Sequence, residues 1–177
     1  MNKTKNLVIT ALMTAMTCIA TMIVKIPSPT GGYIHLGDGL VLLSGILLGP
    51  IWGSLAAGLG SMLADILSSY AIYAPGTFLI KALAALAGSL IFHLLSKGVH
   101  RLKIKPLFVI FAGVIGGIIV TAGYFIFEAT FMGMGAGTAL LNVPFNIVQN
   151  LFGIIVSTFL YPVLTKVAVI RDFSYAK

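Results

Sequence analysis

The chain has 177 residues, of which 59% are hydrophobic and only 8% are charged. Because soluble globular domains carry about 25% charged residues, this composition excludes a soluble domain and predicts an integral membrane protein. The formal net charge of +7 would suit a nucleic-acid-binding protein, but the placement of the basic residues indicates membrane topology instead, and the single cysteine, Cys18, excludes an intrachain disulfide.

Six apolar stretches follow one another along the chain, and a membrane crossing takes about 20 residues. Residues 25–38, rich in proline and glycine, separate the first two and predict an ordered loop or a re-entrant segment. Gly49-Pro50 and Tyr73-Ala-Pro-Gly76 predict turns, residues 97–105 a basic loop, and residues 133–137 a small flexible loop. The six predicted helices span residues 6–24, 39–48, 51–70, 77–96, 106–131 and 141–169.

Basic residues orient these helices. Six crossings put nine of the eleven basic residues on one side, which the positive-inside rule identifies as the cytoplasm. They are Lys3, Lys5, Lys97, Arg101, Lys103, Lys105, Lys166, Arg171 and Lys177. The sequence therefore predicts an all-α fold, a single domain over residues 1–177, and a bundle of six transmembrane helices with both termini cytoplasmic.

Four ionisable side chains lie in or at the edge of the hydrophobic segments: Asp38, Asp65, Lys81 and Glu128. A charge in hydrocarbon costs at least ~2.5–3.5 kcal/mol, so such residues usually serve a function. At about 1.5 Å per residue, Asp65 and Lys81 lie roughly 6–8 Å below the outer surface. They can pair, either as a structural ion pair between two helices or within a ligand site. Asp38 is either a helix cap or a ligand contact.

Amide side chains open the last predicted helix. Asn142, Asn146, Gln149 and Asn150 recur at a spacing that places all four on one helix face, which should look into the bundle because amides facing lipid lack partners. Their alternative role is to hold helices together. The other predicted site residues at this depth are Tyr33, His35, Tyr73, Thr77 and Tyr124. Tyrosines there can also belong to an interfacial belt. We predict a polar chamber that opens outward and is closed inward.

Small residues and missing motifs complete the pattern. Ala11 and Ala15 lie one turn apart on the first helix, on a face suited either to internal packing or to a partner protein. No ATP-binding motif, nucleophile elbow or metalloprotease motif occurs, and no metal or cofactor is expected. We do not expect an enzyme. An autonomous channel or secondary transporter remains an alternative, although no inverted repeat is detectable.

Five fragments give the chain a resemblance to a known family. They are Tyr33-Ile-His-Leu-Gly-Asp38, Leu48-Gly-Pro50, Ala64-Asp65, Tyr73-Ala-Pro-Gly-Thr77 and Lys81-Ala-Leu. Together they resemble the substrate-binding S components of energy-coupling factor (ECF) vitamin transporters, most clearly over residues 25–95. The closest branch is the one associated with hydroxymethylpyrimidine, pyridoxine and riboflavin-type substrates.

The resemblance implies a multi-pass protein of a bacterial-type plasma membrane that binds a vitamin from outside. It implies partnership with a transmembrane coupling subunit and two cytoplasmic ATPase subunits. It also implies that Ala11 and Ala15 contact the coupling subunit, and that Tyr33 and His35 lie in a lid over the ligand. Aromatic rings and amides suit a small, flat, polar heterocycle. Pyridoxine or hydroxymethylpyrimidine is the leading expectation, followed by riboflavin and then pantothenate.

Overall fold

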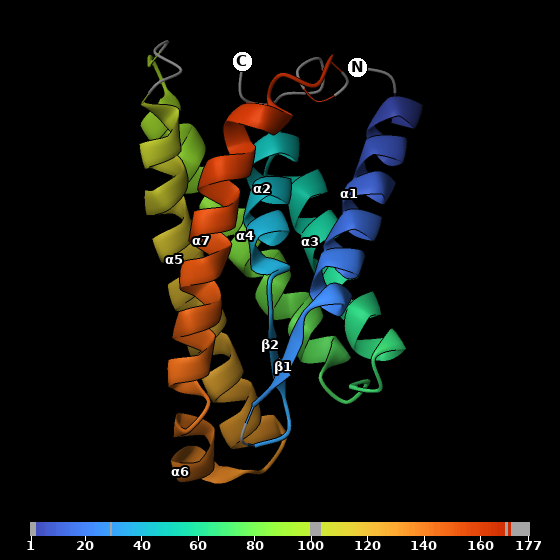
Figure 1. Cartoon of the computed structure of the whole chain (residues 1–177), viewed down its shortest axis with the longest axis vertical. Helices are drawn as coiled ribbons and strands as arrows, with labels where there is room; N and C mark the ends of the chain where they lie inside the picture. Colours follow the sequence, from blue (N-terminus) through green and yellow to red (C-terminus); the bar gives the residue numbers. More distant parts are fainter. Residues whose placement is uncertain (1–2, 29, 100–103, 169, 171–177) are drawn as a thin grey trace.

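The protein is described here by a computed structural model, which places residues 3–28, 30–99, 104–168 and 170. Its helices run along one long axis as a bundle (Figure 1). The elements are α1 (Lys3–Ile23), β1 (Lys25–Pro27), β2 (Tyr33–His35), α2 (Asp38–Leu48), α3 (Pro50–Leu67), α4 (Ala74–Ser96), α5 (Lys105–Ile126), the π-helical turn η1 (Phe127–Phe131), α6 (Gly135–Leu140) and α7 (Val143–Leu164).

Five helical segments in the described part of the chain are long and apolar enough to cross a membrane. They are Lys3–Ile23, Pro50–Leu67, Ala74–Ser96, Lys105–Phe131 and Gly135–Leu164. The outer surface of the bundle carries many exposed large apolar side chains, such as Leu7, Ile51 and Phe159, as lipid-facing helices do. The predicted all-helical membrane bundle is therefore confirmed. The predicted loop at residues 133–137 is wrong in part, because α6 already begins at Gly135.

The second predicted helix, α2, has only eleven residues and occupies the centre of the bundle. Every residue of α2 is buried, and the helix packs against α1, α3, α4, α5 and α7. This follows from its sequence, since a helix that is apolar on all sides has no face for water. Gly45 allows close packing on α4, because a Cβ there would collide with the carbonyl oxygen of Ala85.

A β-hairpin continues the column of α2 toward the end of the bundle remote from the chain termini (Figure 1). β1 and β2 are antiparallel, with Lys25 opposite His35 and Pro27 opposite Tyr33. The described residues of this segment, 25–28 and 30–38, are thus ordered, as predicted, but they contain two short strands that were not predicted. At about 1.5 Å per residue α2 is only about 16 Å long, roughly half the hydrocarbon thickness. The hairpin and the polar side chains fill the other half.

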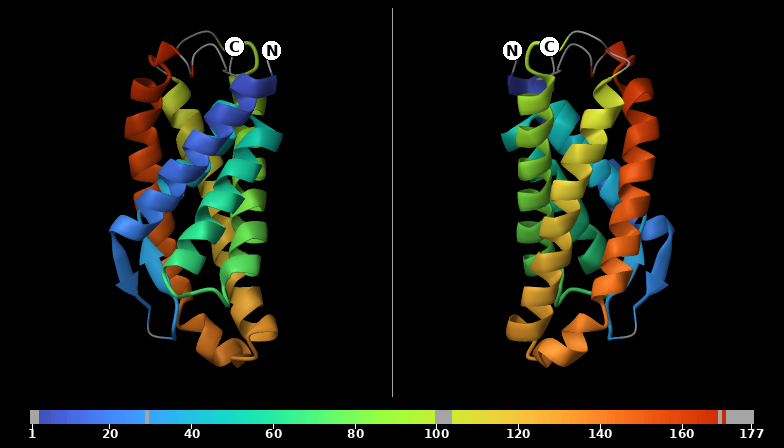
Figure 2. Two further views of the ribbon diagram at one scale, coloured as in Figure 1. Left: turned by 90° about the vertical axis from the view of Figure 1, so that its right-hand side faces the viewer. Right: turned by 90° about the vertical axis from the view of Figure 1, so that its left-hand side faces the viewer.

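The beginning of α1, the end of α4, the beginning of α5 and the end of α7 all lie at one end of the bundle (Figures 1 and 2). Lys3, Lys5, Lys97, Lys105 and Lys166 belong to this end. The other four residues of the predicted basic group, Arg101, Lys103, Arg171 and Lys177, lie outside the described residues. The placed lysines agree with an orientation in which this end is cytoplasmic.

Candidate ligand-binding site

A buried ion pair forms the inner boundary of the polar region. Nζ of Lys81, from α4, lies 2.5 Å from Oδ1 of Asp38 at the start of α2. The Gln149 amide of α7 donates to the other oxygen, Oδ2, at 2.8 Å. The lysine is completely buried, and its ammonium also lies 5.2 Å from the centroid of the Tyr124 ring. Charge and hydrogen bonding together compensate for removing these ions from water.

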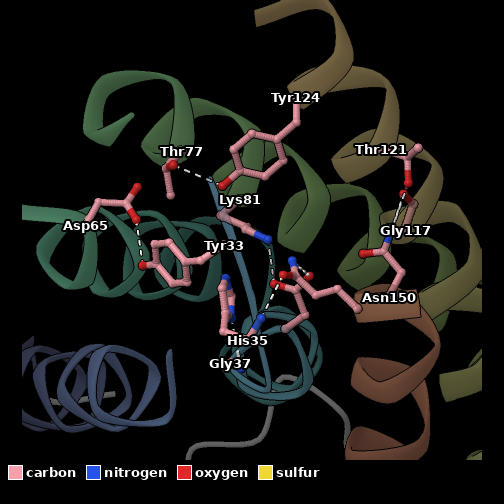
Figure 3. Close-up of polar contacts among 12 residues, drawn as sticks. Tyr33, His35, Gly37, Asp65, Thr77, Lys81, Gly117, Thr121, Tyr124 and Asn150 are labelled. Atoms are coloured by element: carbon pink, nitrogen blue, oxygen red, sulfur yellow. Dashed lines mark hydrogen bonds and ion pairs between the residues drawn. The ribbon is translucent and has the colours of Figure 1, made fainter. Parts of the chain in front are cut away.

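The hairpin is attached to the helices through β2. The Tyr33 hydroxyl donates to Oδ1 of Asp65, on α3, at 2.7 Å, and the backbone N–H of His35 donates to Oε1 of Gln149, on α7, at 2.9 Å. Burial and the nearby Asp65 carboxylate raise the pKa of Tyr33, so its hydroxyl remains a donor. Figure 3 shows Tyr33 and His35 lying between the helices that carry Asp65 and Lys81.

Glu128 forms a second polar group on η1, where the helix widens. Asn142 Nδ2 donates to Glu128 Oε2 at 2.9 Å, and the Tyr73 hydroxyl lies 3.5 Å from Oε1. Burial and Glu128 raise the pKa of Tyr73, which keeps this hydroxyl protonated. Such π-helical turns occur frequently at functional sites, and this one places a buried carboxylate toward the α6–α7 connection.

One pocket joins these groups. Its space between side chains, counted together with the open mouth, is about 420 Å³. Ten of the thirteen predicted binding residues line it: Tyr33, His35, Asp65, Tyr73, Thr77, Tyr124, Glu128, Asn142, Asn146 and Gln149. Thr77 and Tyr124 share a hydrogen bond of 2.9 Å across the wall formed by α4 and α5.

Three predicted binding residues do not line this pocket: Asp38, Lys81 and Asn150. The expected pairing of Asp65 with Lys81 is wrong, because Lys81 pairs with Asp38 and Asp65 accepts from Tyr33. Asp38 makes no capping hydrogen bond, so its predicted role as a cap is also wrong. Residue spacing gives the depth of a side chain but not which neighbouring helix it faces, and α2 lies closer to Lys81 than the sequence could indicate.

Asn150 departs from the amide face. Its Nδ2 donates to the carbonyl oxygen of Gly117 and to Oγ1 of Thr121, both at 2.9 Å, and both partners belong to α5 (Figure 3). The prediction that all four amides look into one chamber is therefore wrong for this residue. Asn150 joins α7 to α5, the helix-linking role that was the alternative reading of these amides.

Four lining residues were not predicted: Ser28, Gly32, Ile34 and Phe145. Three of them belong to the hairpin segment, whose strands were not foreseen, and Phe145 is one apolar residue among many on α7. Only the proximity of Ser28 and Gly32 to Tyr33 in the sequence could have drawn attention to them. No cluster of three or more His, Cys, Asp or Glu side chains within the described residues could hold a metal ion.

Comparison with known proteins decides the family. Residues 1–166 match the family described as ECF-type riboflavin transporter, S component. The chain belongs to this family. The predicted resemblance to ECF S components is thereby confirmed. S components bind a vitamin and work with a membrane T component and ATPases, and they are multi-pass membrane proteins.

Two individual proteins are similar over nearly the whole chain. A Pyrococcus woesei protein described as "Uncharacterized protein in gap 3'region" is 33% identical over 149 residues, which cover 84% of this chain and 93% of that protein. A solved structure titled "Structure and mechanism of the S component of a bacterial ECF transporter" has a TM-score of 0.67 at 23% identity. It covers 93% of this chain and 97% of that chain, and this likeness shows the fold.

Proposed function

We propose that this S component binds pyridoxine or hydroxymethylpyrimidine and delivers it to an ATP-driven importer. The observation that carries the proposal is one pocket lined by three tyrosines, two carboxylates and three side-chain amides. Tyr33, Tyr73 and Tyr124 can stack on a flat ring. Asn146 and Gln149 can recognise ring nitrogens and hydroxyl groups.

Riboflavin is the second candidate, because the matching family carries that vitamin in its description. Its three-ring system is larger than a pyridine or pyrimidine and would fill more of the pocket. Pantothenate is a weaker alternative, because it has no aromatic ring for the tyrosines to stack on.

The docking surface for the coupling subunit belongs to the same proposal. Ala11 and Ala15 are both exposed on α1, one helical turn apart, whereas Ile9 and Met13 of the same helix are buried against the bundle. A face of small residues lets a second helix approach closely in a membrane. Ala11 and Ala15 are therefore free for a partner rather than used in internal packing.

Identification of the co-purifying ligand tests the proposal. The protein is purified in mild detergent without added vitamin, denatured, and the released compounds are identified by mass spectrometry. Pyridoxine or hydroxymethylpyrimidine supports the proposal, and riboflavin favours the second candidate. Uptake by the isolated chain in liposomes, without T component or ATPases, would instead support an autonomous transporter or channel and contradict the proposal.

A further inference from the structure

The charged side chains on the pocket wall are acidic. Asp65 and Glu128 line the pocket, and no lysine or arginine does so among the residues that the structure describes. Lys81 does not line the pocket and forms an ion pair with Oδ1 of Asp38. The other oxygen of that carboxylate accepts a hydrogen bond from Gln149. Lys25 is exposed, and its ammonium donates to the Ser68 hydroxyl. The ligand chamber is thus acidic, although the protein as a whole is basic.

Three buried oxygens on the wall have no hydrogen-bond partner among the described residues: the Ser28 hydroxyl and two oxygens that can only accept. Oδ2 of Asp65 and Oδ1 of Asn142 have no hydrogen-bond partner among the described residues, although their side chains are only 4% and 3% exposed. The Asn142 amide is oriented by Glu128: its NH₂ group faces the carboxylate, so its oxygen is left over. The Thr77 hydroxyl is a second protein donor close to the Asp65 carboxylate, and it is also hydrogen-bonded to Tyr124. Buried acceptors without donors are rare in native proteins. Two of those in the described part of the chain belong to the wall of one pocket.

His35 adds a donor to the pocket but no charge. Burial is the main cause that lowers the pKa of His35 to about 4. The Asp38 carboxylate raises this pKa, and the Lys81 ammonium lowers it further. The ring is therefore neutral at physiological pH. Because its Nδ1 accepts from the backbone N–H of Gly37 at 3.0 Å, the proton is on Nε2. Nothing on the described wall therefore neutralises the two carboxylates.

We infer that the ligand is a heteroaromatic base that presents N–H donors, as an amino group or a protonated ring nitrogen, to Asp65 and to the Glu128–Asn142 pair. Such a group supplies the donors that both unpaired oxygens lack. The inference rests on the proposed function, and within it favours an aminopyrimidine or a pyridinium over riboflavin, whose ring edge offers mostly acceptors.

Isothermal titration of the full-length protein in detergent tests this with matched probes. The first probe is 4-amino-5-hydroxymethyl-2-methylpyrimidine, the second is its 4-oxo analogue, and riboflavin and pyridoxine are included for comparison. We expect the amino compound to bind at least about tenfold more tightly than the oxo analogue. Asp65→Asn keeps the shape of the side chain and removes its charge. It should lower affinity for the amino compound about tenfold and change affinity for the oxo analogue by less than about twofold.

Glu128→Gln is the second variant and gives an independent result if Asp65→Asn does not fold. Ser157→Ala is the control, because Ser157 is buried on α7 outside the pocket and bonds only to its own helix. Equal affinity for the two pyrimidines without tight binding of pyridoxine would overturn the inference. Unchanged binding of the tighter of these ligands in both variants would also overturn it. Tight riboflavin binding without amino-compound binding would overturn it and leave a vitamin-binding S component intact. Failure of all four compounds to bind would contradict the proposed function itself.

Discussion

The Lys81 ammonium lies 2.5 Å from the Asp38 carboxylate, in a position where neither residue contacts water freely. The contact joins α4 to the first turn of α2, and through Gln149 it also reaches α7. Gln149 in turn accepts the His35 backbone N–H. One ion pair therefore connects the central helix, two outer helices and the hairpin.

Lys81→Met leaves the Asp38 carboxylate buried without its cation. We expect the free energy of unfolding to fall by about 3–5 kcal/mol, the usual cost of breaking a buried pair. Thermal unfolding in detergent measures this as a large drop in midpoint. Lys97→Met, at an exposed lysine of the cytoplasmic end, is the control and should change little. A double variant, Lys81→Met with Asp38→Leu, should recover part of the loss; no recovery would contradict a role for the uncompensated charge.

Ala11→Leu and Ala15→Leu test the docking face. Both alanines are exposed on α1, so the added bulk fits the isolated subunit but obstructs close approach of a partner helix. We expect vitamin uptake in cells that contain the T component and ATPases to be abolished, with binding to the purified subunit unchanged. Ala122→Leu makes the same substitution at an exposed alanine of α5 and should leave uptake intact. Loss of binding in the α1 variants would contradict a docking role.

Tyr33→Phe removes the hydroxyl that donates to Asp65 at 2.7 Å. A hydrogen bond to a charged group contributes about 1.5–3 kcal/mol, so we expect ligand affinity to fall roughly tenfold as the hairpin loses its attachment to α3. Titration of the purified protein measures this. Tyr161→Phe, at a buried tyrosine in the apolar core near the cytoplasmic end, is the matched control. Equal effects of the two substitutions would show that Tyr33 acts only through general packing.

Asn146 and Asn150 have different partners although they lie on the same helix. Asn146 lines the pocket, whereas Asn150 bonds to α5. Asn146→Ala should weaken ligand binding and leave the unfolding midpoint nearly unchanged. Asn150→Ala should lower stability by about 1–2 kcal/mol, as expected for an interhelical hydrogen bond, and leave affinity nearly unchanged. The reverse pattern would contradict our assignment of both residues.

The depth of the polar residues could be predicted from the sequence, but their pairing could not. Lysine placement and apolar length indicated a membrane bundle, and counting turns placed Asp65, Lys81 and Glu128 near one level. The partner of Lys81 depends on the rotation of each helix and on α2 lying in the centre. That central position results from packing against five other helices, α1, α3, α4, α5 and α7.

The two short strands were missed for a different reason. Proline and glycine in residues 25–38 predict breaks, and strands of three residues carry no periodic pattern to oppose that prediction. Asn150 shows a third limit. Residues one position apart on a helix differ by about 100° in direction, so Gln149 faces the pocket while Asn150 faces α5.

Acid should destabilise the protein through His35. Burial lowers the pKa of this residue to about 4, against 6.5 for an ordinary histidine. Between these values the unfolded state takes up a proton and the folded state does not, so stability falls as the pH falls. From pH 7 to pH 5 we expect a loss of about 1–2 kcal/mol. Thermal unfolding across this range measures it.

His35→Asn serves as the control for this pH dependence. An asparagine oxygen can still accept the Gly37 N–H but does not titrate. Asp65 and Glu128 titrate in both proteins, so the comparison isolates the histidine. The variant should lose less stability than the wild-type protein over the same range. Identical pH profiles would show that His35 does not carry the effect.

The shortness of α2 has a consequence for the size of the molecule that the protein can hold. Because α2 begins only at Asp38, the space ahead of its first turn is available to the hairpin and the pocket. One additional helical turn ahead of Asp38 would advance about 5.4 Å into that space, and one turn fewer would enlarge it by the same amount. The length of α2 therefore sets the size of the ligand that fits. Inserting or deleting one helical turn at its start changes that size without altering the outer helices.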